Sequence, residues 1–151
     1  MDIITTPAKG NDIRLSEEVQ FYLVLQVPKG RLTRYDDIRK FLCKLYGAAT
    51  IDFEPPIKMR NIPQYHKYLD KIFKNVPFHR VVSSSGEAHN PFDIDRLEKE
   101  GFSLLSKANS MSKKVDDYKK YLFDFEKETN IDISILEKVQ TEGIDNFLSD
   151  C

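Results

Sequence analysis

Near its start the chain has a segment that is apolar on almost every side, unlike the one-sided pattern of a surface helix. Ser16 before it is a candidate N-cap, and Glu17 and Glu18 fall in the first turn, where acidic side chains interact well with the positive helix end. Pro28 then stops the helix. The sequence therefore predicts a central helix. Its apolar residues are Val19, Phe21, Tyr22, Leu23 and Leu25.

A second predicted helix follows the turn VPKG. Thr33 and Asp36 form a T-x-x-D capping pattern, and Gly47 ends the helix. Apolar residues recur at helical spacing between these ends. Residues 48–60 are predicted to be a loop, marked by two consecutive prolines. The apolar positions of this helix are Ile38, Phe41, Leu42, Leu45 and Tyr46.

A third helix and a small wing are predicted next. Asn61 and Gln64 cap the helix, whose apolar face holds Tyr65, Leu69, Ile72 and Phe73. Val81 and Val82 followed by SSSG predict a strand and a hairpin turn. Residues 93–105 are predicted to be a further helix. This order of helices and hairpin is typical of a winged helix-turn-helix.

The predicted fold class is mainly α, a winged helix-turn-helix with a small β-hairpin wing and additional C-terminal helices. Residues 1–14 are predicted to be an irregular lead-in, residues 15–110 the winged-helix domain, and residues 111–151 a charged helical extension. Two apolar stripes predict two helices in that extension. The stripes are Val115, Tyr118, Leu122 and Phe125, and then Ile131, Ile135, Leu136 and Val139.

Charge is unevenly distributed along the chain. Residues 29–80 contain 12 Lys and Arg and 5 Asp and Glu, whereas residues 124–151 contain 2 and 8. A basic region can bind phosphates, because binding there releases condensed counterions. The same composition also fits a solvated lysine-rich surface, and charge alone leaves both interpretations open.

The composition excludes several classes of protein. No apolar run approaches the roughly 20 residues that cross a bilayer, so no membrane association is expected. The start lacks the layout of a secretory signal, which makes a cytoplasmic or nuclear (nucleoid) location the expectation. The only cysteines, Cys43 and Cys151, form no disulfide framework. No Cys/His cluster has metal-ligand spacing, and neither a metal nor a cofactor is expected.

Three stretches match a known pattern in order and spacing. The segment VPFHRVV (residues 76–82) resembles the PCHRV active-site motif of alkylguanine-DNA alkyltransferases, with Phe78 at the position of the reactive cysteine. VPKGRLTRYDDI (residues 27–38) resembles their IPxGxVTTYGDIA, and SSG at residues 84–86 followed by Glu100-Gly101 resembles their later elements. The resemblance covers about residues 21–105. It includes only the DNA-binding half of the family, as in the small alkyltransferase-like proteins.

The substitution at Phe78 decides what chemistry remains. Alkyl transfer needs a thiolate that attacks an alkyl carbon, and a phenyl ring has no nucleophilic atom. By resemblance, His79 and Glu100 are the histidine and glutamate that activate the cysteine in the family. Here they would form an imidazole-to-carboxylate hydrogen bond without a nucleophile. Phe78 is then either a core aromatic or the wall of a former base pocket, together with His79, Arg80 and Glu100.

The resemblance also implies residues that contact DNA. Tyr35 matches the tyrosine that helps turn a nucleotide out of the duplex, and Arg60 is the candidate for the arginine that fills the vacated stack. For Tyr35 a packing role at the helix start, and for Arg60 a solvated loop position, are the alternatives. The expected DNA-binding set is Thr33, Arg34, Tyr35, Arg60, Gln64, Ser84 and Ser85.

The chain departs from the family in three places. Pro63 and Tyr65 replace small residues of the recognition helix. The connection from Tyr35 to Arg60 is longer by roughly ten residues, which predicts an insertion at a loop. The GYxxG element that walls the base pocket is replaced by EAHNPF.

The leading hypothesis is a non-enzymatic DNA-binding protein that holds O6-alkylguanine in duplex DNA and flags it for repair. Its partners would be double-stranded DNA, alkylated DNA included, and a repair protein. The alternative is a degenerate winged-helix module that binds DNA non-specifically or binds a protein. A hydrolytic enzyme that uses His79 and Glu100 has little support, because nothing in the sequence supplies an electrophilic stabiliser.

Overall fold

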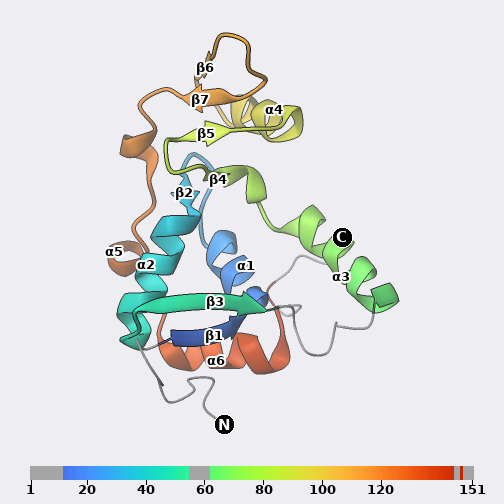
Figure 1. Ribbon diagram of the computed structural model, residues 1–151, viewed down its shortest axis with the longest axis vertical. Coiled ribbons are helices and arrows are strands. Elements are labelled where there is room, and N and C mark those ends of the chain that lie inside the picture. The colour runs from blue at the N-terminus through green and yellow to red at the C-terminus, as the bar shows by residue number, and fades with distance from the viewer. Residues whose placement is uncertain (1–11, 55–61, 145–146, 148–151) are drawn as a thin grey trace.

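Figure 1 shows a computed structural model of the protein, which describes residues 12–54, 62–144 and 147. Helix α1 (Glu17–Leu25) lies at the centre of the larger of two cores. The Ser16 side chain accepts a hydrogen bond from the Glu18 N–H, as the capping pattern predicts. Val19, Leu23 and Val24 are fully buried. The predicted central helix is confirmed.

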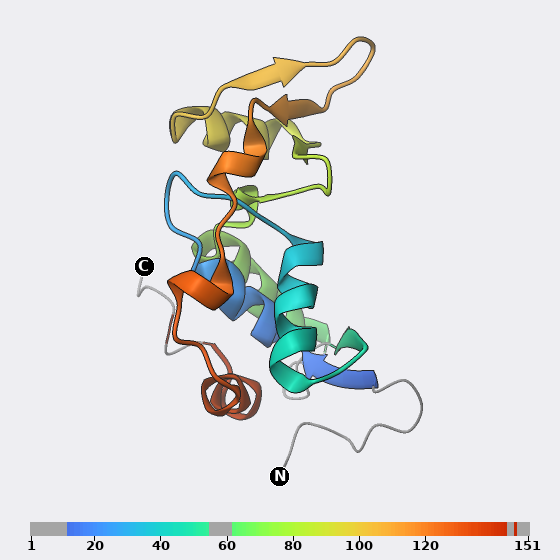
Figure 2. The same ribbon diagram turned by 90° about the vertical axis from the view of Figure 1, so that its left-hand side faces the viewer.

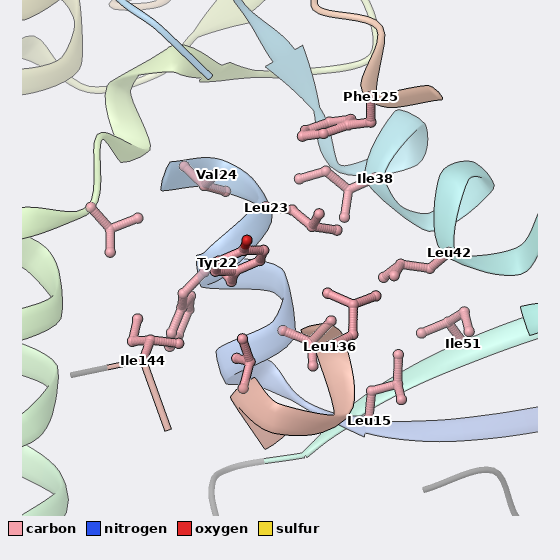
Figure 3. Close-up of a cluster of buried hydrophobic side chains, with 14 of the residues drawn as sticks. Leu15, Tyr22, Leu23, Val24, Ile38, Leu42, Ile51, Phe125, Leu136 and Ile144 are labelled. Carbon is pink, nitrogen blue, oxygen red and sulfur yellow. The ribbon is translucent and has the colours of Figure 1, made fainter. Parts of the chain in front are cut away.

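The larger core forms where α1 meets α2 (Tyr35–Tyr46), α6 (Ile133–Glu142) and a pair of strands (Figure 3). Burying each large apolar side chain here stabilises the fold by about 1.5–3 kcal/mol. Buried Glu18 accepts a hydrogen bond from the Ile144 N–H (2.9 Å), which joins the end of α6 to α1. Residues of this core include Leu15, Leu23, Ile38, Leu42, Ile51, Phe125 and Leu136.

The strand pair corrects two expectations. Strands β1 (Asp12–Ser16) and β3 (Thr50–Glu54) pair in parallel, in segments predicted to be an irregular lead-in and a loop. Each strand has only two inward apolar positions, Ile13 and Leu15 in β1, so the alternation is too short to detect from sequence. The segment after α2, predicted to be a loop, therefore contributes a strand to the fold.

The short strands β2 (Thr33–Arg34) and β4 (Val81–Val82) also pair in parallel. The predicted Thr33–Asp36 cap is wrong, because Thr33 belongs to β2 and is buried, and α2 is capped by Arg34 without a side-chain hydrogen bond. Asp37 binds Arg34 instead. The pairing of β2 with β4 brings the stretches VPKGRLTRYDDI and VPFHRVV next to each other.

The third predicted helix is confirmed as α3 (Ile62–Asn75). Ile72 is fully buried, as expected, but 58% of Phe73 is exposed, so it is not on the buried face. A 3-10 turn, η2 (Phe78–Arg80), connects α3 to β4. Asn61, predicted to cap α3, lies outside the described residues.

The smaller core lies under a three-stranded antiparallel sheet and α4 (Pro91–Lys99). The strand order is β5 (Glu87–Ala88), β7 (Lys113–Val115), β6 (Leu104–Ser106). Helix α4 ends before the predicted residue 105, because Gly101 takes a φ of +100°. This core consists of Leu32, Val82, Ala88, Ile94, Leu97, Phe102, Val115 and Tyr118.

The hairpin is not where the sequence places it. A turn does occur at residues 83–86, closed by the Gly86 N–H donating to the Ser83 carbonyl (2.9 Å), but β4 pairs with β2 and β5 pairs with β7. The two-stranded hairpin is β6–β7. Strands β4 and β5 have two residues each, and strands this short do not determine from the sequence which strands they pair with, even when a serine-rich turn connects them.

The C-terminal segment is only partly helical. The predicted helix along Val115, Tyr118 and Leu122 is wrong: this stretch contains β7, the 3-10 turn η3 (Tyr118–Tyr121) and an extended link to α5 (Phe125–Glu128). The apolar residues of this stretch pack in two different cores: Val115 and Tyr118 pack in the smaller core, and Phe125 packs in the larger core. The second stripe is confirmed as α6. The described chain is mainly helical with small sheets, and none of its helices is long and apolar enough to cross a membrane.

Candidate functional site

The motif VPFHRVV lies where α3 ends. Val76 is buried, and the Arg80 N–H donates to the Pro77 carbonyl (3.0 Å), which closes the η2 turn. The chain then enters β4 beside β2. Phe78, His79 and Arg80 are therefore held by a short turn between the two cores.

His79 and Glu100 form the hydrogen bond that the sequence analysis expects. His79 Nε2 lies 2.5 Å from Glu100 Oε2, and the two side chains are only 7% and 12% exposed. Glu100 is positioned by the end of α4, where its N–H donates to carbonyls of the last turn. Because an ionised carboxylate only accepts hydrogen bonds, Nε2 is the donor in this contact.

Arg80 binds the same carboxylate. Its Nε lies 3.1 Å from Glu100 Oε1 and its Nη2 3.0 Å from Oε2, while Nη1 donates to the Val27 carbonyl (2.8 Å). Burial acts to raise the pKa of Glu100, but the hydrogen bonds and charges of Arg80 and His79 outweigh it and hold that pKa below its ordinary value. Arg80 thus joins η2, the end of α4 and the end of α1.

This cluster keeps one polar atom unused. Among the described residues, His79 Nδ1 and Tyr46 Oη are the buried side-chain nitrogen and oxygen atoms that have no hydrogen-bond partner. Both oxygens of the Glu100 carboxylate are bound, by the Arg80 guanidinium and by His79 Nε2. The cluster can hold the turn rigidly, and the adjacent phenyl ring of Phe78 offers no nucleophilic atom to activate.

Phe78 packs between two other phenylalanines. Its ring centroid lies 5.5 Å from that of Phe21 in an edge contact and 5.4 Å from that of Phe73 in a tilted one. Phe78 is half-buried against the larger core, and Phe73 is mostly exposed. The ring therefore lies at the border between core and surface.

Arg34 and the turn at residues 83–86 are brought together beside this motif. Arg34 Nη1 donates to the Ser84 carbonyl (3.1 Å), and its Nε donates to Asp37 (2.7 Å). Ser84 and Ser85 are exposed. The expected DNA-binding residues Arg34, Ser84 and Ser85 thus lie at one surface.

Tyr35 lies at the first position of α2, next to Arg34, and is 41% exposed. Partial desolvation of its hydroxyl, together with the negative charge of Asp93, raises the pKa of the phenol. The phenol therefore stays protonated and able to donate a hydrogen bond at neutral pH.

Three expected DNA-binding residues are not placed at this surface. Thr33 is fully buried in β2, so its side chain has no surface to offer a partner, and this expectation is corrected. Arg60 lies outside the described residues. Gln64 belongs to α3, but its side chain lies outside the described part of the structure.

Tyr118, which no sequence pattern indicated, contacts both Arg34 and the turn at residues 83–86. Its hydroxyl donates to the Ser84 carbonyl (3.3 Å), and the Arg34 guanidinium carbon lies 5.8 Å from its ring centroid. A Cβ at Gly86 would collide with the Tyr118 ring, and Gly86 has a φ of +82°. The glycine of SSSG was a signal for such a close approach, but nothing in the sequence pointed to Tyr118 as the neighbour.

Other reactive side chains offer little chemistry. Burial raises the pKa of the Cys43 thiol, which Arg39 only partly offsets, so the nucleophilic thiolate is disfavoured. Cys151 lies outside the described residues. Within residues 12–54, 62–144 and 147 no group of three His, Cys, Asp or Glu side chains is arranged to hold a metal.

No protein-family model matches the chain, and no curated protein matches it. Two solved structures are similar. One is a crystal structure of S. pombe Atl1 in complex with damaged DNA containing O6-carboxymethylguanine, with 20% identity over 71% of this chain and 94% of that chain and a TM-score of 0.44. The other is S. pombe ATL in complex with DNA, with 21% identity over 70% and 93% and a TM-score of 0.44. At this level of similarity, function has to be argued from the residues themselves.

Proposed function

We propose that this protein is a non-enzymatic, alkyltransferase-like DNA-binding protein with a winged helix-turn-helix fold. It binds duplex DNA and holds O6-alkylguanine without transferring the alkyl group. By its resemblance to alkyltransferase-like proteins, the bound complex would mark the lesion for a repair protein.

One observation carries this proposal. Strand β2 pairs with β4, and Arg80 binds the Val27 carbonyl, so that the stretches VPKGRLTRYDDI and VPFHRVV, about fifty residues apart in sequence, adjoin. The two stretches were matched independently by sequence. Because they adjoin in the structure, the two matches are better explained as parts of one site than as two chance matches.

The lack of catalysis follows from the residues of that site. Phe78 stands at the cysteine position, and Cys43, on α2, has a raised thiol pKa. His79 and Glu100 are retained but are bound to each other and to Arg80. They serve to fix the turn on which Phe78 lies.

A second candidate function is a degenerate module that binds DNA without recognising lesions. The observation that favours it is the packing of Phe78 against Phe21 and the larger core, which is a structural role. In that case no pocket would be available for an extruded base.

A binding comparison separates the two functions. Matched duplexes carrying guanine or O6-methylguanine at one position are titrated with the protein, with fluorescence anisotropy as the readout. The proposed function predicts at least about tenfold tighter binding to the modified duplex, a difference of about 1.4 kcal/mol. Equal affinity for both duplexes would leave only the second candidate.

A further inference from the structure

We propose that the β6–β7 hairpin is a second DNA contact, in which lysine side chains bind backbone phosphates beside the candidate site. The inference rests on the proposed function, because it takes duplex DNA as the partner. It adds a surface that the motif residues do not include.

The hairpin projects from one end of the molecule. Figures 1 and 2 show β6 and β7 at the end opposite β1, β3 and α6, with their connecting loop extending outward. Its base is firmly held, because β7 pairs with both β6 and β5 and Val115 is fully buried. Such a projection can reach a partner while its base stays fixed on the smaller core.

The hairpin carries positive charge only. Residues 102–115 contain three lysines and no Asp or Glu, although the chain as a whole has 24 acidic residues. Lys114 is exposed on the outer side of β7. A polyanion is the partner that this charge distribution complements.

Lys113 and Lys114 can give up their present contacts and bind phosphates instead. Lys107 binds Glu87 (3.0 Å) and Lys113 lies 3.9 Å from Glu98, with the two lysine side chains 49% and 34% exposed. The Lys113–Glu98 pair is long and partly exposed and contributes little, so a phosphate can replace this carboxylate at small cost, whereas the Glu87 side chain that binds Lys107 is only 14% exposed. Leu105 in β6 and Met111 in the connecting loop are also exposed, and DNA-bending proteins insert such apolar side chains between base steps.

Tyr118 links the hairpin to the candidate site. The Lys114 ammonium lies 5.6 Å from the centroid of the Tyr118 ring, and the Arg34 guanidinium carbon lies 5.8 Å from the same centroid. The Tyr118 hydroxyl binds the Ser84 carbonyl in the exposed turn. The hairpin and the candidate site are therefore continuous, and one duplex can contact both.

The test compares two variants that lose the same charge. Lys113→Gln/Lys114→Gln removes it from the hairpin, and the control Lys127→Gln/Lys138→Gln removes it from exposed lysines of α5 and α6. Affinity for an unmodified duplex is measured from about 50 to about 200 mM salt. Loss of two phosphate contacts should lower the log–log salt slope by about 1.8, so that the wild type loses about tenfold more affinity than the hairpin variant over this range.

The control should keep the wild-type slope, and Lys113→Arg/Lys114→Arg should restore it. Circular dichroism melting of each variant verifies the fold. If the wild type binds DNA and the hairpin variant keeps its slope, the hairpin contact is overturned while the proposed function stands. In that case a protein becomes the candidate partner for Leu105 and Met111. If the wild type does not bind DNA, both proposals are overturned.

Discussion

Phe78 lies at the border of the larger core and is only half-buried there. Its ring contacts the rings of Phe21 and Phe73, and Phe73 is 58% exposed. A fully buried phenylalanine costs about 3–5 kcal/mol when truncated to alanine. A partly exposed ring that also meets a ligand should cost less stability and change binding more.

Phe78→Ala is therefore expected to lower the free energy of unfolding by about 2 kcal/mol, below the range for a buried aromatic. It should also alter the ratio of affinities for O6-methylguanine and guanine duplexes. Urea unfolding and anisotropy titrations measure the two effects. Phe92→Ala, at an exposed aromatic of α4, is the control and should change neither by much. A loss near 4 kcal/mol with unchanged discrimination would show that Phe78 is only a core residue.

At the scale of elements, Glu100 connects three parts of the chain. Through His79 and Arg80 it binds η2 to the end of α4, and Arg80 continues to the Val27 carbonyl after α1. Removing one partner of a buried ion pair leaves the other charge uncompensated. The arrangement of these elements should therefore depend on the carboxylate.

Glu100→Gln is expected to destabilise the protein by about 3 kcal/mol at pH 7. Because the folded-state pKa of Glu100 lies below its ordinary value, this stabilisation is present above the pKa of the unfolded chain, about 4.3, and is lost as the pH falls through the folded-state value. The difference between wild type and variant in urea unfolding should thus shrink toward pH 3. Glu98→Gln, on the exposed side of α4, is the control. A difference that stays constant from pH 7 to pH 3 would contradict the ionised carboxylate.

The elements also show where sequence patterns suffice. Helices α2 and α3 were predicted because each has several apolar residues at helical spacing and signals at its ends. Helix α1 was predicted from an apolar segment behind an N-cap, and α6 from an apolar stripe alone. Strands β1, β2, β3 and β4 were missed or mispaired, since two to five residues carry too little periodicity to define a strand or its partner. The His79–Glu100 bond came from the motif, whereas Tyr118 could be placed only by the tertiary fold.

On the scale of the whole molecule, the larger core and the smaller core carry different elements at opposite ends (Figure 1). Strands β1 and β3 and helix α6 lie together at one end, and the hairpin and α4 occupy the other end (Figure 1). The acidic C-terminal segment is tied to basic residues of the first half, since Glu128 binds Arg31 (2.6 Å) and Glu126 binds Lys44 (2.8 Å). Part of the basic charge counted in residues 29–80 is thus compensated internally. At the other end, Lys114 of the hairpin is exposed, and Arg34, although paired with Asp37, lies beside the exposed Ser84.

The central claim is that the protein binds alkylated DNA and leaves it unchanged. Native mass spectrometry of the protein mixed with an O6-methylguanine duplex tests binding and chemistry in one spectrum. We expect a protein–duplex complex that, after denaturation, yields unmodified protein and fully methylated DNA, because Phe78 provides no nucleophile. A protein that gains one methyl group, mapped to Cys43 or Cys151, or a spectrum without any complex would contradict the account.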